Sequence, residues 1–375
     1  NIPFTDNLLH DDPFNTLQNK VTSTIKYLCE IKGAGRREIR KSTSCMRSFL
    51  LLSGGTMQTQ AIDKNLRIAV LAGGRSSERE VSLKSGENAR DALQAAGFKK
   101  VDLLDPADKM FIDCIRDYDL AFLAMHGAGG EDGEIQHVLD YLDIPYTASD
   151  AFSSACGADK DVSKLIYANA GIPIAKGVTL KKDDPITVED IVAVVGEESF
   201  VKPAVNGSSY GISLVKNPSE LPCAIEKAFK YSDKVLIEQR LVGTEITVGV
   251  FGDSETLKPL PVVEICCPEQ SDFYDLTVKY VDPTYIHRIP ARISKEDCEQ
   301  AQDLACRAHE ALGCFGISRS DFIVTSSGPV ILETNTIPGM TDASLFPDEL
   351  RHANIEFSDA CASLVEMALA RAGRR

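Results

Sequence analysis

The sequence has no apolar run that approaches the roughly 18 or more residues needed to span a membrane. The cluster Phe49–Leu52 is too short even for the hydrophobic core of a signal peptide. The eleven cysteines include no CxxC pair and no spacing with histidine that suits a metal ion. Because Cys266 and Cys267 are adjacent, a disulfide framework is unfavourable. We interpret the cysteines as reduced thiols of a cytoplasmic protein.

The chain also has no excess of positive charge. Its formal net charge of −15 argues against nucleic acid as a main partner, because phosphate binding needs a basic surface. The motifs GxGxxG and GxxxxGK[ST] are absent, so neither a dinucleotide fold nor a P-loop is supported. A length of 375 residues predicts two or three domains, and an apolar share of 43% is ordinary for a globular protein.

Residues 1–64 differ from the rest, because Lys and Arg outnumber Asp and Glu there while the whole chain is acidic. The chain begins with Asn, and Met57 stands shortly before the first strong predicted strand. We treat residues 1–64 as an N-terminal extension of unknown role. For residues 1–56 the sequence leaves three alternatives open: an upstream fusion remnant, a processed leader and a mistaken start.

Two early strands are followed by loops with polar side chains. The apolar runs Leu66–Ala72 and Leu120–Met125 are typical of buried parallel strands, and the first continues into a glycine turn and a helix. This is the start of a doubly wound α/β unit, whose ligands bind beside the carboxyl ends of the strands. We therefore expect loops carrying Glu80 and His126 to face one crevice. A structural, hydrogen-bonded role is an equal alternative for His126, and a solvated helix start is the favoured alternative for Glu80.

A loop of small residues, 204–211, lies between two predicted strands. Such a loop can fold over a phosphate group and donate backbone N–H bonds to it. Lys202, just before the loop, could reach the same phosphate. Taken by itself, an ordinary hairpin loop is the favoured alternative.

A second hairpin carries a candidate metal site. The β-rich runs DFIVT and VILET are joined by Ser326–Pro329, a loop that we predict to be longer than the tight two-residue kind. A turn centred near Ser327 places Asp321 opposite Glu333 and Arg319 opposite Asn335 on one face. Two facing carboxylates repel each other, and a divalent cation bound between them would turn this repulsion into a net attraction. The alternatives are a solvated polar face and a register slipped by one residue.

Eight motifs in one order identify a family resemblance. They are EREVS at 78–82, HGAGGEDG at 126–133, ADK at 158–160, VKP at 201–203, NGSSYG at 206–211, FYDLTVKY at 273–280, SRSD at 318–321 and LETNTIPGMT at 332–341. Each is weak alone, but together they resemble the D-alanine:D-alanine ligases of the ATP-grasp superfamily, over some 300 of the 375 residues.

The resemblance implies an α/β (α+β) fold, with an N-terminal doubly wound parallel-sheet domain followed by a two-part ATP-grasp fold. The implied segments are an N-terminal substrate-binding domain, a central subdomain and a C-terminal subdomain, at 65–150, 151–241 and 242–375. The implied reaction is ATP-dependent joining of two D-alanines through an acyl phosphate, for peptidoglycan precursor synthesis. A ligase that uses D-lactate or D-serine, or another ATP-grasp carboxylate–amine ligase, is the alternative. FYDLTVKY favours the dipeptide product, and the family resemblance implies a homodimer.

The resemblance also implies roles on the nucleotide side. The Mg2+ (or Mn2+) ligands are Asp321, Glu333 and Asn335. The cations that contact phosphate are Lys160, Lys202 and Lys279. The loop covering the phosphates contains Ser208 and Ser209. The adenosine contacts are Glu238 and Glu245.

On the amino-acid side, Glu80 is implied as the partner of the first substrate's ammonium, with His126 in the same crevice. Arg319 and the Gly339 N–H resemble an oxyanion site. Ser344 and Leu345 match the loop that holds the second substrate's carboxylate. A hydrogen-bonded group that closes the mobile loop is implied for Glu80, Ser208 and Tyr280. Closure matters because water hydrolyses an acyl phosphate.

Overall fold

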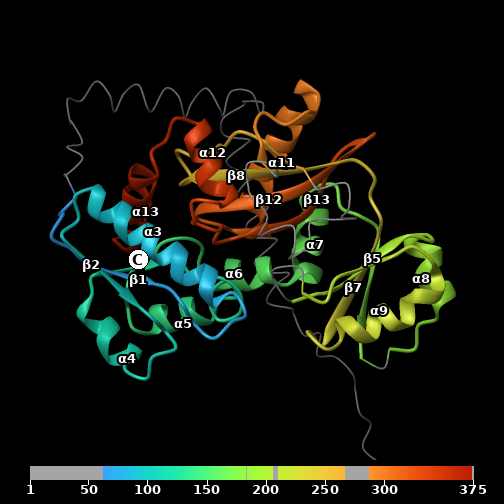
Figure 1. Cartoon of the computed structure of the whole chain (residues 1–375), viewed down its shortest axis with the longest axis horizontal. Coiled ribbons are helices and arrows are strands. Elements are labelled where there is room, and N and C mark those ends of the chain that lie inside the picture. Colours follow the sequence, from blue (N-terminus) through green and yellow to red (C-terminus); the bar gives the residue numbers. More distant parts are fainter. Residues whose placement is uncertain (1–61, 183, 206–209, 267–286, 374–375) are drawn as a thin grey trace, which may run out of the picture. The chain divides into compact units, whose positions relative to one another are not determined.

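The computed structural model describes residues 62–182, 184–205, 210–266 and 287–373, which all lie within one compact unit. The described part contains three sheets, and they follow one another along the chain (Figure 1). The first falls within 65–150, the second within 151–241 and the third within 242–375, which supports the expected α/β class. The domain boundaries themselves stay predictions.

The first sheet is parallel, as expected. Its order is β2 (Lys100–Leu104), β1 (Arg67–Leu71), β3 (Leu120–Leu123). Helix α3 (Arg79–Ala95) follows β1 and turns its small residues to the sheet: a Cβ at Gly86 would lie 2.3 Å from that of Ala72. The segment that follows Ile144 adds only an isolated parallel bridge to this sheet, between Tyr146 and Ala121.

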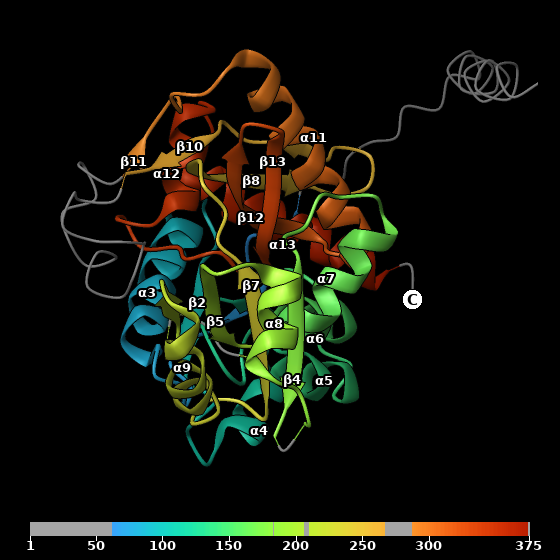
Figure 2. The same ribbon diagram turned by 90° about the vertical axis from the view of Figure 1, so that its right-hand side faces the viewer.

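The second sheet is antiparallel, in the order β4 (Gly177–Lys181), β7 (Lys234–Gln239), β5 (Ser199–Pro203), β6 (Ser213–Val215). Helices α8 (Val188–Val195) and α9 (Leu221–Ala228) pack on it (Figure 2). A capping box explains where α8 begins, since Thr187 accepts from the Asp190 N–H and Asp190 accepts from the Thr187 N–H.

The third sheet carries the predicted hairpin. Its order is β11 (His287–Arg288), β10 (Val263–Ile265), β8 (Thr244–Gly252), β12 (Gly316–Thr325), β13 (Gly328–Asn335), with β9 (Lys258–Pro259) paired to β8. Helix α11 (Lys295–Leu312) packs along this sheet, and α6 (Ala151–Ala158) and α7 (Lys160–Asn169) contact its strand β13. Ser294 caps the start of helix α11, and Gly313, at φ 74°, ends the helix.

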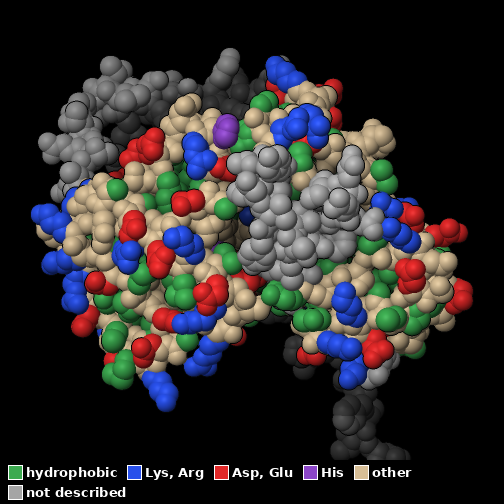
Figure 3. All heavy atoms as spheres, in the orientation of Figure 1, with side chains coloured by type: hydrophobic (Ala, Val, Ile, Leu, Met, Phe, Trp, Pro, Cys, Tyr) green, Lys and Arg blue, Asp and Glu red, His purple; other side chains and the backbone are tan. Residues whose placement is uncertain are grey.

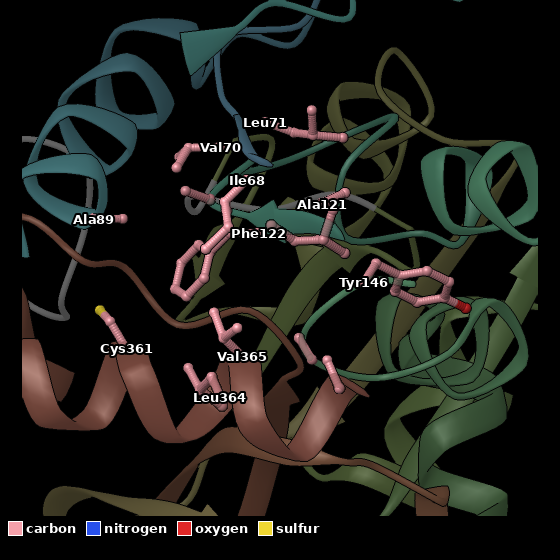
Figure 4. Close-up of a cluster of buried hydrophobic side chains, with 14 of the residues drawn as sticks. Ile68, Val70, Leu71, Ala89, Ala121, Phe122, Tyr146, Cys361, Leu364 and Val365 are labelled. Carbon is pink, nitrogen blue, oxygen red and sulfur yellow. The ribbon is translucent and has the colours of Figure 1, made fainter. Parts of the chain in front are cut away.

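The end of the chain returns to the first sheet. Helix α13 (Phe357–Ala372) packs beside α3, and α12 (Leu345–His352) precedes it. In the close-up of this core, Phe122 lies near Val365 and Leu364 of α13 (Figure 4). The C-terminal helix thus completes the core of the N-terminal sheet, so segments far apart in sequence are needed for one core.

No helix in the described ranges has both the length and the apolar character that crossing a membrane requires. The eight cysteines that the structure describes are all free thiols. On the face shown in Figure 3, acidic and basic side chains are interspersed.

Candidate active site

The β12–β13 hairpin has the register that the sequence predicts. Asp321 pairs with Glu333 and Arg319 pairs with Asn335. The predicted long loop is wrong, however, because Thr325 pairs with Gly328 and only two residues form the turn. A β-bulge between the two halves of the ladder reconciles these facts: Phe322 pairs with Ile331, so Leu332 is an extra residue opposite Asp321.

The carboxylates of the hairpin lie beside basic groups. Arg319 holds Asp321 with two bonds of 3.1 Å, from Nε to Oδ1 and from Nη2 to Oδ2. The Lys160 Nζ lies 3.0 Å from Glu333 Oε2. In the described residues, no three His, Cys, Asp or Glu side chains form a group that could hold a metal. The donor set that the resemblance implies consists of the carboxylates of Asp321 and Glu333 and the amide oxygen of Asn335. These are hard oxygen ligands suited to Mg2+.

A cleft of about 550 Å3 lies beside the hairpin. Six of the residues predicted for the nucleotide side line this cleft: Lys160, Lys202, Glu238, Glu245, Asp321 and Glu333. Asn335 is the one predicted nucleotide-side residue within the described ranges that does not. The segment 239–244, between β7 and β8, and Leu345 also line it. The geometry thus brings these predicted residues to one cavity, of a size that suits a small-molecule ligand.

Glu238 is buried at the inner end of this cleft. It forms ion pairs with Lys202 of β5 and with Lys164 of α7, and its side chain is only 3% exposed. Burial by itself would raise the pKa of Glu238, but the two ammonium groups outweigh it and the pKa is lowered. The sequence analysis missed Lys164, because nothing in a single sequence connects it to a residue so far along the chain.

A second cleft, of about 310 Å3, adjoins the first. Asn335, Gly339 and His126 line it, with the glycine-rich loop that follows His126. Lys160, Arg319 and Glu333 line both clefts. The two cavities therefore meet at three charged side chains, two of which belong to the hairpin.

His126 is held on both ring nitrogens. Its Nδ1 lies 3.2 Å from Glu131 Oε1, and its Nε2 lies 2.8 Å from Ser85 Oγ. Ser85 Oγ also accepts the Met340 N–H, at 3.2 Å. His126 is thus hydrogen-bonded on both ring nitrogens, as the structural alternative requires, and it also lines the second cleft.

Glu80 does not take the predicted place. It is exposed and is not among the residues that line either cleft, whereas Glu78 lines the second one. The reason is helical geometry: residues two apart in a helix point to roughly opposite sides. The buried side of α3 includes Ser82, Ser85 and Ala89, and stepping back by four residues from Ser82 reaches Glu78. This periodicity is the signal that could have identified Glu78 from the sequence.

The predicted loop after the hairpin lies close to the second cleft. A Cβ at Gly339 would stand 2.8 Å from Ser344 Oγ, so glycine permits this close approach. Ser344 Oγ is bound by Thr341, through its N–H at 3.1 Å and its hydroxyl at 2.7 Å. Four predicted site residues lie outside the described residues: Ser208, Ser209, Lys279 and Tyr280.

Comparison with known proteins gives consistent matches. A family model described as "D-ala D-ala ligase C-terminus" matches residues 166–366. The D-alanine–D-alanine ligase of Syntrophobacter fumaroxidans is 41% identical over 309 residues, with 82% of this chain and 98% of that protein covered. The same enzyme of Pelotomaculum thermopropionicum is 41% identical over 320 residues, covering 83% and 99%. The crystal structure of the Bacillus anthracis ligase complexed with ATP matches with a TM-score of 0.71 and 30% identity, covering 83% and 99%.

Proposed function

Since this chain belongs to the D-alanine–D-alanine ligase family, with its ATP-grasp C-terminal part, we propose that it joins two D-alanines to D-alanyl-D-alanine while ATP becomes ADP and phosphate. The observation that carries the proposal is the pair of clefts that meet at Lys160, Arg319 and Glu333. The larger cleft suits the nucleotide and the smaller one suits amino acids. The product is a precursor for peptidoglycan.

The chemistry has two steps. A carboxylate oxygen of the first D-alanine attacks the terminal phosphorus of ATP, and ADP leaves. The amine nitrogen of the second D-alanine then attacks the carbonyl carbon of the acyl phosphate, loses a proton, and inorganic phosphate leaves. Lys160 and Lys202 lower the repulsion between two anions in the first step. Arg319 and the Gly339 N–H stabilise the oxyanion in the second.

We assign the metal to the hairpin. Asp321, Glu333 and Asn335 would hold Mg2+ (or Mn2+), which neutralises charge on phosphate oxygens when bound. The donor set fits, because Asp321 pairs with Glu333 across adjacent strands, Asn335 lies on the same face, and each side chain offers a hard oxygen ligand. Asp321 and Glu333 lie beside Arg319 and Lys160 here, so their oxygens are already in a basic environment.

The remaining contacts follow from the two clefts. Glu238 and Glu245 bind the adenosine in the larger cleft. In the smaller cleft Glu78, in place of Glu80, binds the ammonium of the first D-alanine, because Glu78 is the acid of its motif that lines the cavity. Ser344 and Leu345 hold the carboxylate of the second. The lid formed by Ser208 and Tyr280 stays a prediction.

The test is phosphate release from ATP and Mg2+ with D-alanine, with L-alanine, and with D-alanine plus D-lactate. We expect release with D-alanine, giving the dipeptide, and no ester from D-lactate at neutral pH. Activity with L-alanine alone, or ester formation at neutral pH, would contradict the proposal. The homodimer also stays a prediction, and light scattering on the purified protein measures it directly.

A further inference from the structure

Three charged side chains are buried together at the inner end of the larger cleft. Glu238 lies on β7, Lys202 on the neighbouring strand β5 and Lys164 on helix α7. Their side chains are 3%, 11% and 8% exposed. Two positive charges and one negative charge are therefore buried together, where an unpaired charge would be strongly unfavourable.

The two lysines are not equivalent in position. Lys202 lines the larger cleft together with Glu238, whereas Lys164 is not among its lining residues. Each lysine pairs with a different oxygen of Glu238, Lys164 with Oε1 and Lys202 with Oε2. Lys164 therefore approaches the carboxylate from within the protein, and Lys202 approaches it from the ligand side.

Lys164 also contacts the hairpin. Its Nζ donates to the Ile331 carbonyl oxygen of β13 at 3.3 Å. Ile331 lies next to the bulge residue Leu332, and its own N–H donates to the Pro173 carbonyl at 2.9 Å. One ammonium group thus links the sheet that carries Glu238 with the hairpin that carries the candidate metal ligands.

We propose that Lys164 is a positioning residue: it is the permanent counterion of Glu238, and it frees Lys202 to exchange that carboxylate for a phosphate oxygen of the nucleotide. The inference rests on the proposed function. When Lys202 turns to the phosphate, Glu238 would otherwise be a buried carboxylate without a cation, which is strongly unfavourable. Lys164 removes that penalty, and Glu238 Oε2 becomes available to the adenosine.

The pKa directions agree with this division. Burial lowers the pKa of Lys164, and the Glu238 carboxylate opposes that change. Glu238 thus favours the charged form of Lys164, and Lys202 and Lys164 together favour the charged form of Glu238. Removing the charge of Lys164 should damage the site, and removing the charge of Glu238 as well should repair much of that damage.

The experiment compares Lys164→Met, Lys164→Arg, Glu238→Gln and the double variant Lys164→Met/Glu238→Gln. Thermal unfolding is measured without ligand, and ADP binding is measured by calorimetry with Mg2+. We expect Lys164→Met to weaken ADP binding by at least about tenfold, which corresponds to a typical coupling within a charge network. Lys164→Arg should keep most of the affinity because it keeps the charge. The exposed Lys230→Met is the matched control and should match the wild type.

The double variant tests whether Lys164 acts as the counterion of Glu238. Its melting temperature should exceed that of Lys164→Met, because a neutral amide side chain needs no counterion. If Lys164→Met fails to fold and the double variant folds, the proposal is supported; loss of folding in both overturns it. Equal effects of Lys164→Met in the wild-type and Glu238→Gln backgrounds, or unchanged ADP affinity in Lys164→Met, also overturn it. Wild-type protein that binds no ADP would instead contradict the proposed function.

Discussion

Glu349 is a buried acid whose replacement should change how stability depends on pH. Its side chain, on α12, is fully buried, and Oε1 accepts the Gly249 N–H at 2.6 Å. A Cβ at Gly249 would lie 2.5 Å from Glu349 Oε2, so the absent side chain makes room for the carboxyl. Burial raises the pKa of Glu349 to about 8; Arg319 opposes this rise, and Asp321 and Asp348 add to it.

The direction in which stability changes with pH follows from proton linkage. The folded state holds the proton more tightly than the unfolded chain, where a glutamate has its ordinary pKa of about 4.3. The contribution to stability is therefore fully present below the unfolded pKa and is lost as the pH rises through about 8. Between about pH 5 and about pH 9 the loss amounts to about 4 kcal/mol.

Glu349→Gln should remove this slope. Gln carries no titrating proton, and its amide oxygen can still accept the Gly249 N–H. Urea unfolding of both proteins at about pH 5 and about pH 9 should show the wild type losing about 4 kcal/mol more free energy of unfolding than the variant. The exposed Glu366→Gln is the control and should follow the wild type. Parallel pH profiles for wild type and Glu349→Gln would refute the reasoning.

Three shorter predictions concern the site and its scaffold. Glu333→Gln should lower turnover sharply with an unchanged circular dichroism spectrum, and near-normal turnover would count against the metal assignment. Glu78→Gln should raise the KM for the first D-alanine at least about tenfold, as expected for loss of a charged hydrogen bond, while Glu80→Gln should not; the reverse result would restore the original assignment. Gly133→Ala should lower the free energy of unfolding by about 1–3 kcal/mol, because glycine has φ 94° there and a Cβ would lie 2.4 Å from the Ala151 carbonyl oxygen; an unchanged urea midpoint would contradict this.

Strongly apolar runs could be predicted from the sequence alone. Strands β1 and β3 lie within the predicted runs Leu66–Ala72 and Leu120–Met125. Helix α6 was missed because its sequence, AFSSACGA, places Ser, Cys and Gly, which have weak helix preference, between its alanines. Its Asp150 cap and its contacts with β13 compensate for that weakness, and contacts of this kind are not visible in a short window of sequence.

The site shows the same division. The facing of Asp321 and Glu333 follows from strand alternation, and the structure confirms it. The tight turn and the bulge could not be predicted separately. The turn is one residue shorter than predicted, and the bulge adds one residue to β13, so the pairing of Asp321 with Glu333 is the same as predicted. The Lys164–Glu238 pair forms only because α7 and β7 pack together in the fold, so no local sequence pattern could predict it.

The bulge at Leu332 has a consequence for how homologous chains can vary in length. A two-residue turn with regular pairing would set Asp321 opposite Leu332 and would shift Glu333 to the other surface of the strand pair. Deleting the bulge residue is therefore tolerable only in a chain that also lengthens its turn by one residue. Gaps in these two places should compensate each other, so that the strand lengths change while the acidic pair stays in place.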